Sequence, residues 1–131
     1  SYVRDLLSEL FALYPGREIS VSVEIGTHTL PTKKATSLGL VLNELATNAM
    51  KHGFSEERKP TFSVRLEEDH HAAEYVLTVS NSGRPVPEEV EVGRQGAFGL
   101  QLVSALIEEL NGTLEFRKSP SAEFTIRLPK E

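Results

Sequence analysis

Hydrophobic positions along this chain follow two periods, one typical of helices and the other typical of strands. Spacings of three and four residues predict an opening helix that ends near Pro15-Gly16, a second helix around Leu40 to Phe54, and a third that starts after Gly99. We expect Gly112, which follows Asn111, to cap the third helix. Alternating or short apolar runs predict strands at 19–25, 62–66, 75–79, 113–117 and 124–128, with 28–31 as a short partner.

The order of these elements indicates a fold class. The polar stretch between 66 and 75 and the Ser119-Pro120-Ser121 turn each join two neighbouring strands, so both pairs read as antiparallel hairpins. Helices on one face of a mixed, mostly antiparallel sheet form an α+β two-layer sandwich. The strand order within the sheet does not follow from these patterns.

The second helix carries polar groups inside its hydrophobic pattern. At about 100° per residue one stripe is apolar, and a separate stripe holds a carboxylate, an amide and two basic groups: Glu44, Asn48, Lys51 and His52. Asn48 offers an amide oxygen to Mg²⁺, which binds one or two protein ligands together with phosphate oxygens and water. Glu44 is placed to orient or deprotonate a metal-bound water, and Lys51 to neutralise phosphate. The alternative interpretation is a solvated helix face without a ligand.

Two glycine-containing segments follow this helix. Asn81 ends an apolar run, where its amide can pair with a purine edge, and Gly83 permits a backbone conformation or a close ligand approach that a side chain would block. Gly96 and Gly99 stand at the entrance of the third helix, where free N–H groups and the helix dipole favour phosphate. An ordinary Asn-Ser-Gly turn and a flexible loop are the alternatives. Neither GxGxxG nor GxxxxGK[ST] spacing is present.

Three motifs in this order carry a family resemblance. NELATNAMKHGF, NSGRPVP and GAFGLQLVSALIEELNGTLEF are similar to the N box and the two glycine boxes of the ATP-binding catalytic domain of bacterial sensor histidine kinases. These kinases belong to the Bergerat-fold ATPases, which also include gyrase and MutL. The resemblance extends from about Leu38 to Leu128 and is greatest for the subgroup with a short ATP lid. It implies a Bergerat fold that binds ATP and Mg²⁺.

The resemblance also implies roles for the residues on the phosphate side of the site. Asn48 is implied as the magnesium ligand, and Glu44 as the catalytic carboxylate that polarises the hydrolytic or metal-bound water. Lys51 and His52 are implied to face the phosphates or the ribose. The residues that lie against the triphosphate at the start of the third helix are Gly96, Gly99 and Leu100. Asn43 is off the polar stripe and is interpreted as a surface amide.

The adenine side departs from the family pattern. Gly83 is implied to border the adenine, and Asn81 stands where family members usually carry an Asp that accepts a hydrogen bond from the adenine amino group. An amide oxygen still accepts, but it carries no charge. Pro85 replaces a family glycine, and Phe98 adds bulk at the lid end. A nucleotide-poor interaction module that retains only the fold is therefore one functional alternative.

Composition is consistent with one soluble domain. We expect residues 1–131 to form a single histidine kinase-like ATPase domain, with 1–13 as the connection to a dimerisation and phosphoacceptor domain outside this sequence. A net charge of −5 argues against nucleic acid as a partner, and the absence of an 18-residue apolar run argues against membrane contact by this domain. The chain has no cysteine, which fits a cytoplasmic location. His70 and His71 are interpreted as surface-loop residues.

The functional hypothesis that follows is a two-component histidine kinase. In it the domain supplies the γ-phosphoryl group to a histidine on the dimerisation and histidine phosphotransfer domain, and a response regulator is the later partner. An anti-sigma-factor-type serine kinase has a similar helix motif and is the second alternative. The sequence EELNGTLEF after the second glycine box favours the histidine kinase.

Overall fold

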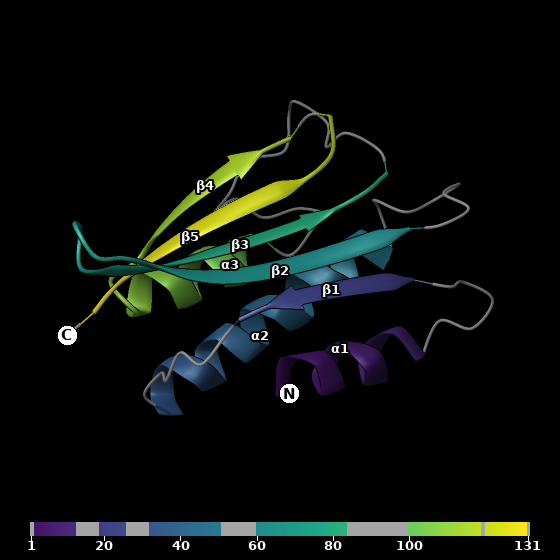
Figure 1. Ribbon diagram of the computed structural model, residues 1–131, viewed down its shortest axis with the longest axis horizontal. Coiled ribbons are helices and arrows are strands. Elements are labelled where there is room, and N and C mark those ends of the chain that lie inside the picture. The colour runs from purple at the N-terminus through teal and green to yellow at the C-terminus, as the bar shows by residue number, and fades with distance from the viewer. Residues whose placement is uncertain are drawn as a thin grey trace.

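A computed structural model describes residues 2–12, 19–25, 32–50, 60–83, 100–118 and 120–130. Within these residues the chain forms three α-helices and five β-strands (Figure 1). Their order is α1 (Tyr2–Ala12), β1 (Ser20–Glu24), α2 (Thr32–Asn48), β2 (Thr61–Asp69), β3 (Glu74–Asn81), α3 (Leu100–Glu109), β4 (Thr113–Arg117) and β5 (Glu123–Pro129). The predicted strand at 28–31 lies outside the described residues, as do residues 51–54 of the second predicted helix.

The described strands form one mixed sheet in the order β1-β2-β3-β5-β4. β1 runs parallel to β2, whereas the β2–β3, β3–β5 and β4–β5 pairs are antiparallel, which confirms both predicted hairpins. Figure 1 shows α1, α2 and α3 on one side of this sheet. The α+β two-layer sandwich is therefore confirmed, and the strand order, which the sequence patterns left open, is now defined.

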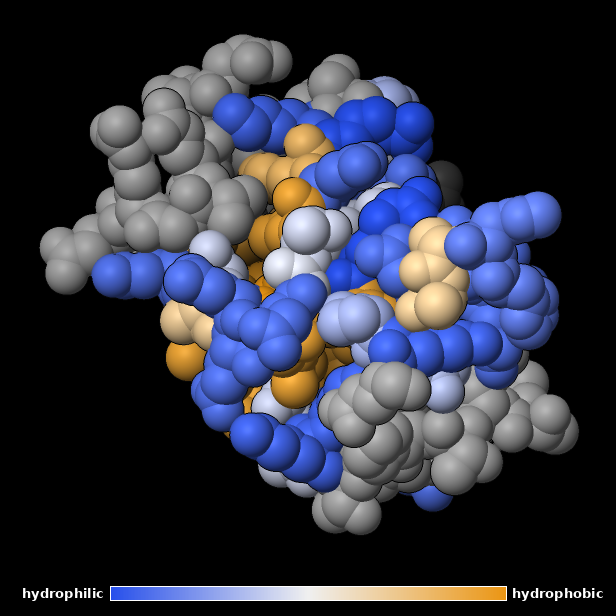
Figure 2. Space-filling model, turned by 90° about the vertical axis from the view of Figure 1, so that its left-hand side faces the viewer, coloured by the Kyte–Doolittle hydropathy of each residue, from blue (hydrophilic) through white to orange (hydrophobic). Residues whose placement is uncertain are grey.

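The core lies between the sheet and the helices. Alternate residues of the central strands are buried: Phe62, Val64 and Leu66 on β2, Leu77 and Val79 on β3, and Phe124, Ile126 and Leu128 on β5. Successive side chains of a strand point to opposite faces, so one face of the sheet packs against the helices and the other meets solvent. Figure 2 shows one end of the molecule, where hydrophobic residues are visible in a band between hydrophilic ones.

Helix α1 is packed into this core. Leu7 is completely buried, and the Phe11 ring meets the Phe62 ring edge-on at a centroid distance of 5.5 Å. Arg4 donates a hydrogen bond to the carbonyl of Val21 over 3.3 Å, which satisfies a backbone acceptor on the edge strand β1. Helix α1 is thus a packed element of the domain, and a continuation from it into another domain stays a prediction.

The C-terminal end of β5 is held from two directions. The buried Lys34 of α2 donates from Nζ to the carbonyl of Pro129 over 2.8 Å. The backbone N–H of Lys130 donates to the carbonyl of Ala73 over 2.8 Å, and its ammonium group pairs with Glu68. These contacts join the first turn of α2 and the β2–β3 turn to the last strand.

The cap of α3 differs from the expectation. The residue with a left-handed backbone is Asn111, with φ of 59°, rather than Gly112. The N–H of Gly112 donates to the carbonyl of Ile107 and the N–H of Asn111 to the carbonyl of Glu108, each over 2.9 Å, which is the hydrogen-bond pattern of a Schellman motif. Asn adopts this conformation more readily than most residues because its short polar side chain can hydrogen-bond to the nearby backbone. Gly112 is required for a different reason, because neighbouring residues leave no room for a side chain at this position.

The close approach at Gly112 generates a stability prediction. A Cβ at this position would lie 2.6 Å from Leu128 Cδ2 and 2.7 Å from the Arg127 carbonyl oxygen, and the backbone oxygen cannot move aside cheaply. We expect Gly112→Ala to lower the free energy of unfolding by about 1–3 kcal/mol. Asn111→Gly is the matched control and should change stability by only a few tenths of a kcal/mol, because Gly also adopts positive φ. Urea denaturation measures both, and equal effects would contradict the assignment.

Candidate functional site

The polar stripe on α2 lies beside the core. Leu45 and Ala49 are buried, while Glu44 and Asn48 are half-buried, as the predicted separation of polar and apolar stripes requires. Residues one turn apart face the same side of a helix, so the carboxylate and the amide are neighbours. Lys51 and His52, the other two members of the stripe, lie outside the described residues. The described part of the site therefore offers two oxygen-bearing groups at the rim of the core.

The helix changes its geometry within the stripe, directly after Asn48. α2 is α-helical to Asn48, and Ala49 and Met50 form a π turn. One residue before Asn48, the hydroxyl of Thr47 donates to the carbonyl of Asn43 over 2.8 Å. Such bonds to the preceding turn bend helices, and π turns inside helices often occur at functional sites. Asn48 thus stands at a junction between two helical geometries.

The end of β3 presents a second polar group. Asn81 continues the alternation of Leu77 and Val79, and only 7% of its surface is exposed. Because residues two apart share a face of a strand, the Asn81 side chain lies on the face that the helices cover. Its Nδ2 donates to the carbonyl oxygen of Ser82 over 2.8 Å, and its backbone N–H donates to the carbonyl of Ala122 over 3.2 Å.

Ser82 is tied to the start of β2. Its backbone N–H donates to the carbonyl of Thr61 over 3.0 Å, and its Oγ accepts the N–H of Thr61 over 2.9 Å. Gly83 follows with φ of 109°, a conformation that favours glycine, so the predicted backbone conformation is confirmed, while a close ligand approach at this residue stays a prediction. The positions of Pro85, Phe98, Gly96 and Gly99 lie outside the described residues.

The third predicted motif begins the described part of α3. Leu100 is the first described residue of α3 and is buried, so its side chain belongs to the core. Helices α2 and α3 pack against each other. Glu44, Asn48 and Leu100 therefore come from adjacent helices, and Asn81 lies on the sheet face that these helices cover.

The described residues contain no alternative metal centre. No three His, Cys, Asp or Glu side chains gather within them in a way that would hold a metal ion. His70, whose side chain is 79% exposed, lies 3.7 Å from Glu68 in the β2–β3 turn. The N–H of Ala72 donates to Asp69 Oδ1 over 3.1 Å and lowers the pKa of that carboxyl. This turn is a solvated charged loop, which confirms the interpretation of His70 and His71 as exposed residues.

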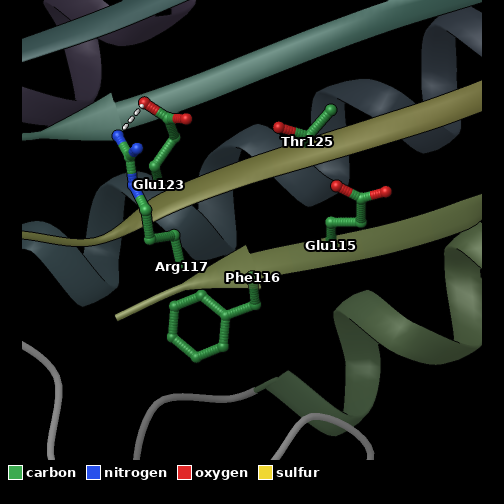
Figure 3. A pocket seen from close by; sticks show the side chains of 5 residues that line it. All are labelled: Glu115, Phe116, Arg117, Glu123 and Thr125. Atoms are coloured by element: carbon green, nitrogen blue, oxygen red, sulfur yellow. Dashed lines mark hydrogen bonds and ion pairs between the residues drawn. The ribbon is translucent and has the colours of Figure 1, made fainter. Parts of the chain in front are cut away.

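A shallow depression of about 250 Å³ lies at the edge of the sheet, over β4 and β5 (Figure 3). It is lined by Glu115, Phe116, Arg117, Glu123 and Thr125. Arg117 and Glu123 form an ion pair at 2.9 Å, and their side chains are 62% and 32% exposed. Figure 3 shows Phe116 turned away from Glu115, and its ring stacks on Phe124 at 4.5 Å. Exposed ion pairs of this kind contribute little stability.

The sequence patterns missed two polar residues that shape the site. Thr47 and Ser82 act through hydrogen bonds to the main chain of Asn43 and Thr61, and no spacing rule specifies those partners. A signal was present for Ser82, because Ser, Asn and Gly together favour turns in which side chains bond to the backbone. At Thr47, the helical spacing of apolar residues gave no indication that the side chain bonds to the backbone.

Comparisons with known proteins agree on one family. Residues 33–131 match the family described as histidine kinase-, DNA gyrase B-, and HSP90-like ATPase. Blue-light-activated histidine kinase 2 of Erythrobacter litoralis is 31% identical over 97 residues, which are 73% of this chain and 28% of that protein. Sensor histidine kinase PdtaS of Mycolicibacterium smegmatis is 29% identical over 103 residues, which are 76% of this chain and 20% of that protein.

Structural similarity extends beyond the matched sequence. The solved structure of the Erythrobacter litoralis EL346 blue-light activated histidine kinase superposes with a TM-score of 0.84 and 26% identity. The superposition covers 98% of this chain and 40% of that chain. This chain thus spans less than a third of the length of the curated relatives that it matches. Among the described helices, none is long and apolar enough to cross a membrane.

The hydrogen bonds of Ser82 generate a prediction for the site. Ser82→Ala removes the acceptor of the Thr61 N–H, and we expect the free energy of unfolding to fall by about 0.5–1.5 kcal/mol. Ser82→Thr keeps the hydroxyl and should retain most of the stability. Chemical denaturation of the three proteins checks this. If the threonine variant lost as much stability as the alanine variant, the hydroxyl would not be the cause.

Proposed function

Because this chain belongs to the family of histidine kinase-, DNA gyrase B- and HSP90-like ATPases, we propose that it binds Mg-ATP on the polar stripe of α2 and supplies the γ-phosphoryl group to a histidine. The observation that carries the proposal is the pair of half-buried oxygen-bearing side chains, Glu44 and Asn48, one turn apart beside the core. A ligand that covers this rim can reach both groups at once.

Asn48 is the proposed protein ligand of the magnesium ion. Mg²⁺ takes oxygen donors and keeps most of its coordination sites for water and phosphate oxygens, so one amide is an adequate protein contribution. The π turn that follows Asn48 supports this role, because π turns in helices often occur at functional sites. When bound, the ion neutralises charge on the phosphate oxygens.

Glu44 is the proposed catalytic carboxylate. Its half-buried position one turn before Asn48 lets it accept a hydrogen bond from a water or a hydroxyl beside the phosphates. Lys51 and His52 would complete the stripe as donors to phosphate or ribose oxygens. Because phosphoryl transfer asks little covalent chemistry of the protein, these side chains act by positioning and by charge stabilisation.

The remaining parts of the nucleotide are assigned to α3 and β3. The backbone N–H of Leu100 at the start of α3 is a proposed donor to the triphosphate, together with Gly96 and Gly99. Asn81 and Gly83 are proposed to border the adenine. The position of Asn81 on the helix-covered face of β3 supports the assignment, because a base between sheet and helices would meet that face.

The phosphoryl acceptor is proposed to be a histidine on a separate dimerisation and phosphotransfer domain of the same protein. The matched relatives are histidine kinases several times longer than this chain, which supports a partner domain outside it and favours histidine over serine as the acceptor. A response regulator would receive the phosphoryl group next. ATP as donor is consistent with the cytoplasmic location that the motif resemblance implies.

Nucleotide binding is tested by calorimetric titration with ADP and a non-hydrolysable ATP analogue, with and without Mg²⁺. We expect Asn48→Ala to weaken binding at least tenfold in Mg²⁺, about 1.4 kcal/mol, because the ion loses its protein ligand. Asn43→Ala is the matched control on the same helix and should bind like the wild-type protein. The proposal fails if the wild-type domain binds no nucleotide at millimolar concentration, or if both variants behave alike.

Phosphoryl transfer is tested in the full-length protein with ATP labelled at the γ-phosphate. We expect Glu44→Gln to slow the appearance of acid-labile phosphohistidine roughly 100-fold or more, because the amide keeps the shape of the side chain but cannot take a proton. Its nucleotide affinity should stay within about threefold of wild type, since binding rests on Asn48 and the phosphate donors. Wild-type transfer rates in Glu44→Gln would remove the carboxylate from the mechanism.

A further inference from the structure

A second pair of side chains lies beside the polar stripe of α2. Asn43 and Thr47 are one turn apart, as Glu44 and Asn48 are, and the two pairs are one residue, about 100°, from each other around the helix. The half-buried Thr47 donates from its hydroxyl to the carbonyl of Asn43 over 2.8 Å. This bond therefore runs alongside the helical turn that separates the proposed carboxylate from the proposed metal ligand.

The Thr47 hydroxyl acts on the helix and not on a phosphate. A hydroxyl has one proton, and that of Thr47 is donated to Asn43, so none is left for a phosphate oxygen. In an α-helix the same carbonyl also accepts the backbone N–H four residues later, which is that of Thr47. Thr47 thus bonds twice to one acceptor, and this second bond favours α-helical geometry in the turn from 43 to 47.

The α-helical geometry ends one residue after Thr47. Asn48 is the last residue of α2, and the buried Ala49 is the first residue of the π turn. In π geometry an N–H bonds to the carbonyl five residues back instead of four. Because the hydroxyl of Thr47 strengthens the bonding to Asn43, the turn before Asn48 resists this change. The change to π geometry is therefore kept on the far side of Asn48.

The place of this change decides where the Asn48 amide points. At a spacing of four residues, Glu44 and Asn48 share one side of an α-helix. A π turn that began before Asn48 would widen the turn between them and swing the amide away from the carboxylate. Mg²⁺ demands near-octahedral geometry from its ligands, so a misdirected amide would bind the ion less well.

We propose that Thr47 is a positioning residue for the magnesium site, because its hydroxyl keeps the Asn48 amide in line with Glu44. The inference rests on the proposed function, since it requires Asn48 to bind Mg²⁺ beside a nucleotide. Asn43 then contributes to the site through its backbone carbonyl alone. The Asn43→Ala control retains that carbonyl and so leaves the bond from Thr47 in place.

The stability of the helix does not depend on this hydroxyl. Hydroxyl bonds to the preceding turn slightly destabilise helices, and Thr and Val have similar helix propensities. In Thr47→Val the Asn43 carbonyl keeps its backbone donor, so no buried acceptor is left without a partner. The urea midpoint of this variant should therefore not fall below that of the wild-type protein.

Calorimetric titration with a non-hydrolysable ATP analogue, in Mg²⁺ and in EDTA, measures how much the ion contributes to binding. We expect Mg²⁺ to tighten binding about tenfold or more in the wild-type protein and about threefold or less in Thr47→Val, because the amide is no longer aimed at the ion. Thr47→Ser keeps the hydroxyl and should keep most of the magnesium effect. Thr36→Val, the same change at an exposed position of α2, should behave like wild type.

A double variant tests whether Thr47 acts through Asn48. In the Asn48→Ala background, Thr47→Val should change the affinity in Mg²⁺ by about twofold or less, because the amide that it positions is already absent. The urea midpoint of each variant is measured alongside. A role confined to folding would lower the midpoint and leave the magnesium effect of the folded protein unchanged.

Each contrary outcome has a separate meaning. A wild-type magnesium effect in Thr47→Val, an equal loss in Thr47→Ser, or additive losses in the double variant would overturn the inference and leave the proposed function standing. If the wild-type protein bound no nucleotide, or bound it equally with and without Mg²⁺, the proposed function would fail as well. Should Thr47→Val not fold, Thr47→Ala decides instead, because it removes the same hydroxyl and favours the helix.

Discussion

Burial of one side of α2 against the sheet is the constraint on which the rest of the structure depends. Val41, Leu45 and Ala46 are almost completely buried. A rotation of the helix by one residue, about 100°, would expose such side chains at about 1.5–3 kcal/mol for each large one. The helix is therefore fixed about its axis. Glu44 and Asn48 lie at the rim of the core because the apolar side leaves them no other position.

The end of β3 is buried in the same core. Asn81 follows Leu77 and Val79 on the buried face, so the strand carries a polar group into a region that is otherwise apolar. Within the described residues every fully buried side-chain nitrogen or oxygen has a hydrogen-bond partner. A buried amide without a partner would cost roughly 1–3 kcal/mol, so the bond to Ser82 stabilises the fold and orients the side chain at once.

Much of the fold could be predicted because its signals are local. The β2–β3 and β4–β5 hairpins join neighbouring segments, and their alternation of apolar residues shows on the sequence. The parallel pairing of β1 with β2 could not be predicted, because it joins segments separated by a whole helix and leaves no local pattern. The cap of α3 was assigned to Gly112 because glycine is the usual residue with positive φ. Asn111 takes that role since Gly112 is required where Leu128 and Arg127 come close.

The candidate site also has some features that the sequence predicts and others that it does not. Glu44 and Asn48 were found from helical period and chemistry, and their half-buried positions agree with that pattern. The orientation of Asn81 was out of reach, because it depends on which atom of Ser82 lies nearby in three dimensions. Similarly, the bond from Thr47 to Asn43 and the π turn after Asn48 are properties of the folded helix, and the residue types at these positions allow several geometries.

The parallel pairing of β1 and β2 has a consequence for the order of assembly. Ser20 pairs with Thr61, so the two strands can meet only when the whole intervening chain, α2 included, has been brought across the sheet. Closing a long loop costs more entropy than closing a hairpin, and contacts distant in sequence slow folding. The helix that carries Glu44 and Asn48 is the middle of that crossover. The site helix therefore takes its place only as β1 and β2 come together, so a change that weakens this strand pair would also disturb the position of Glu44 and Asn48.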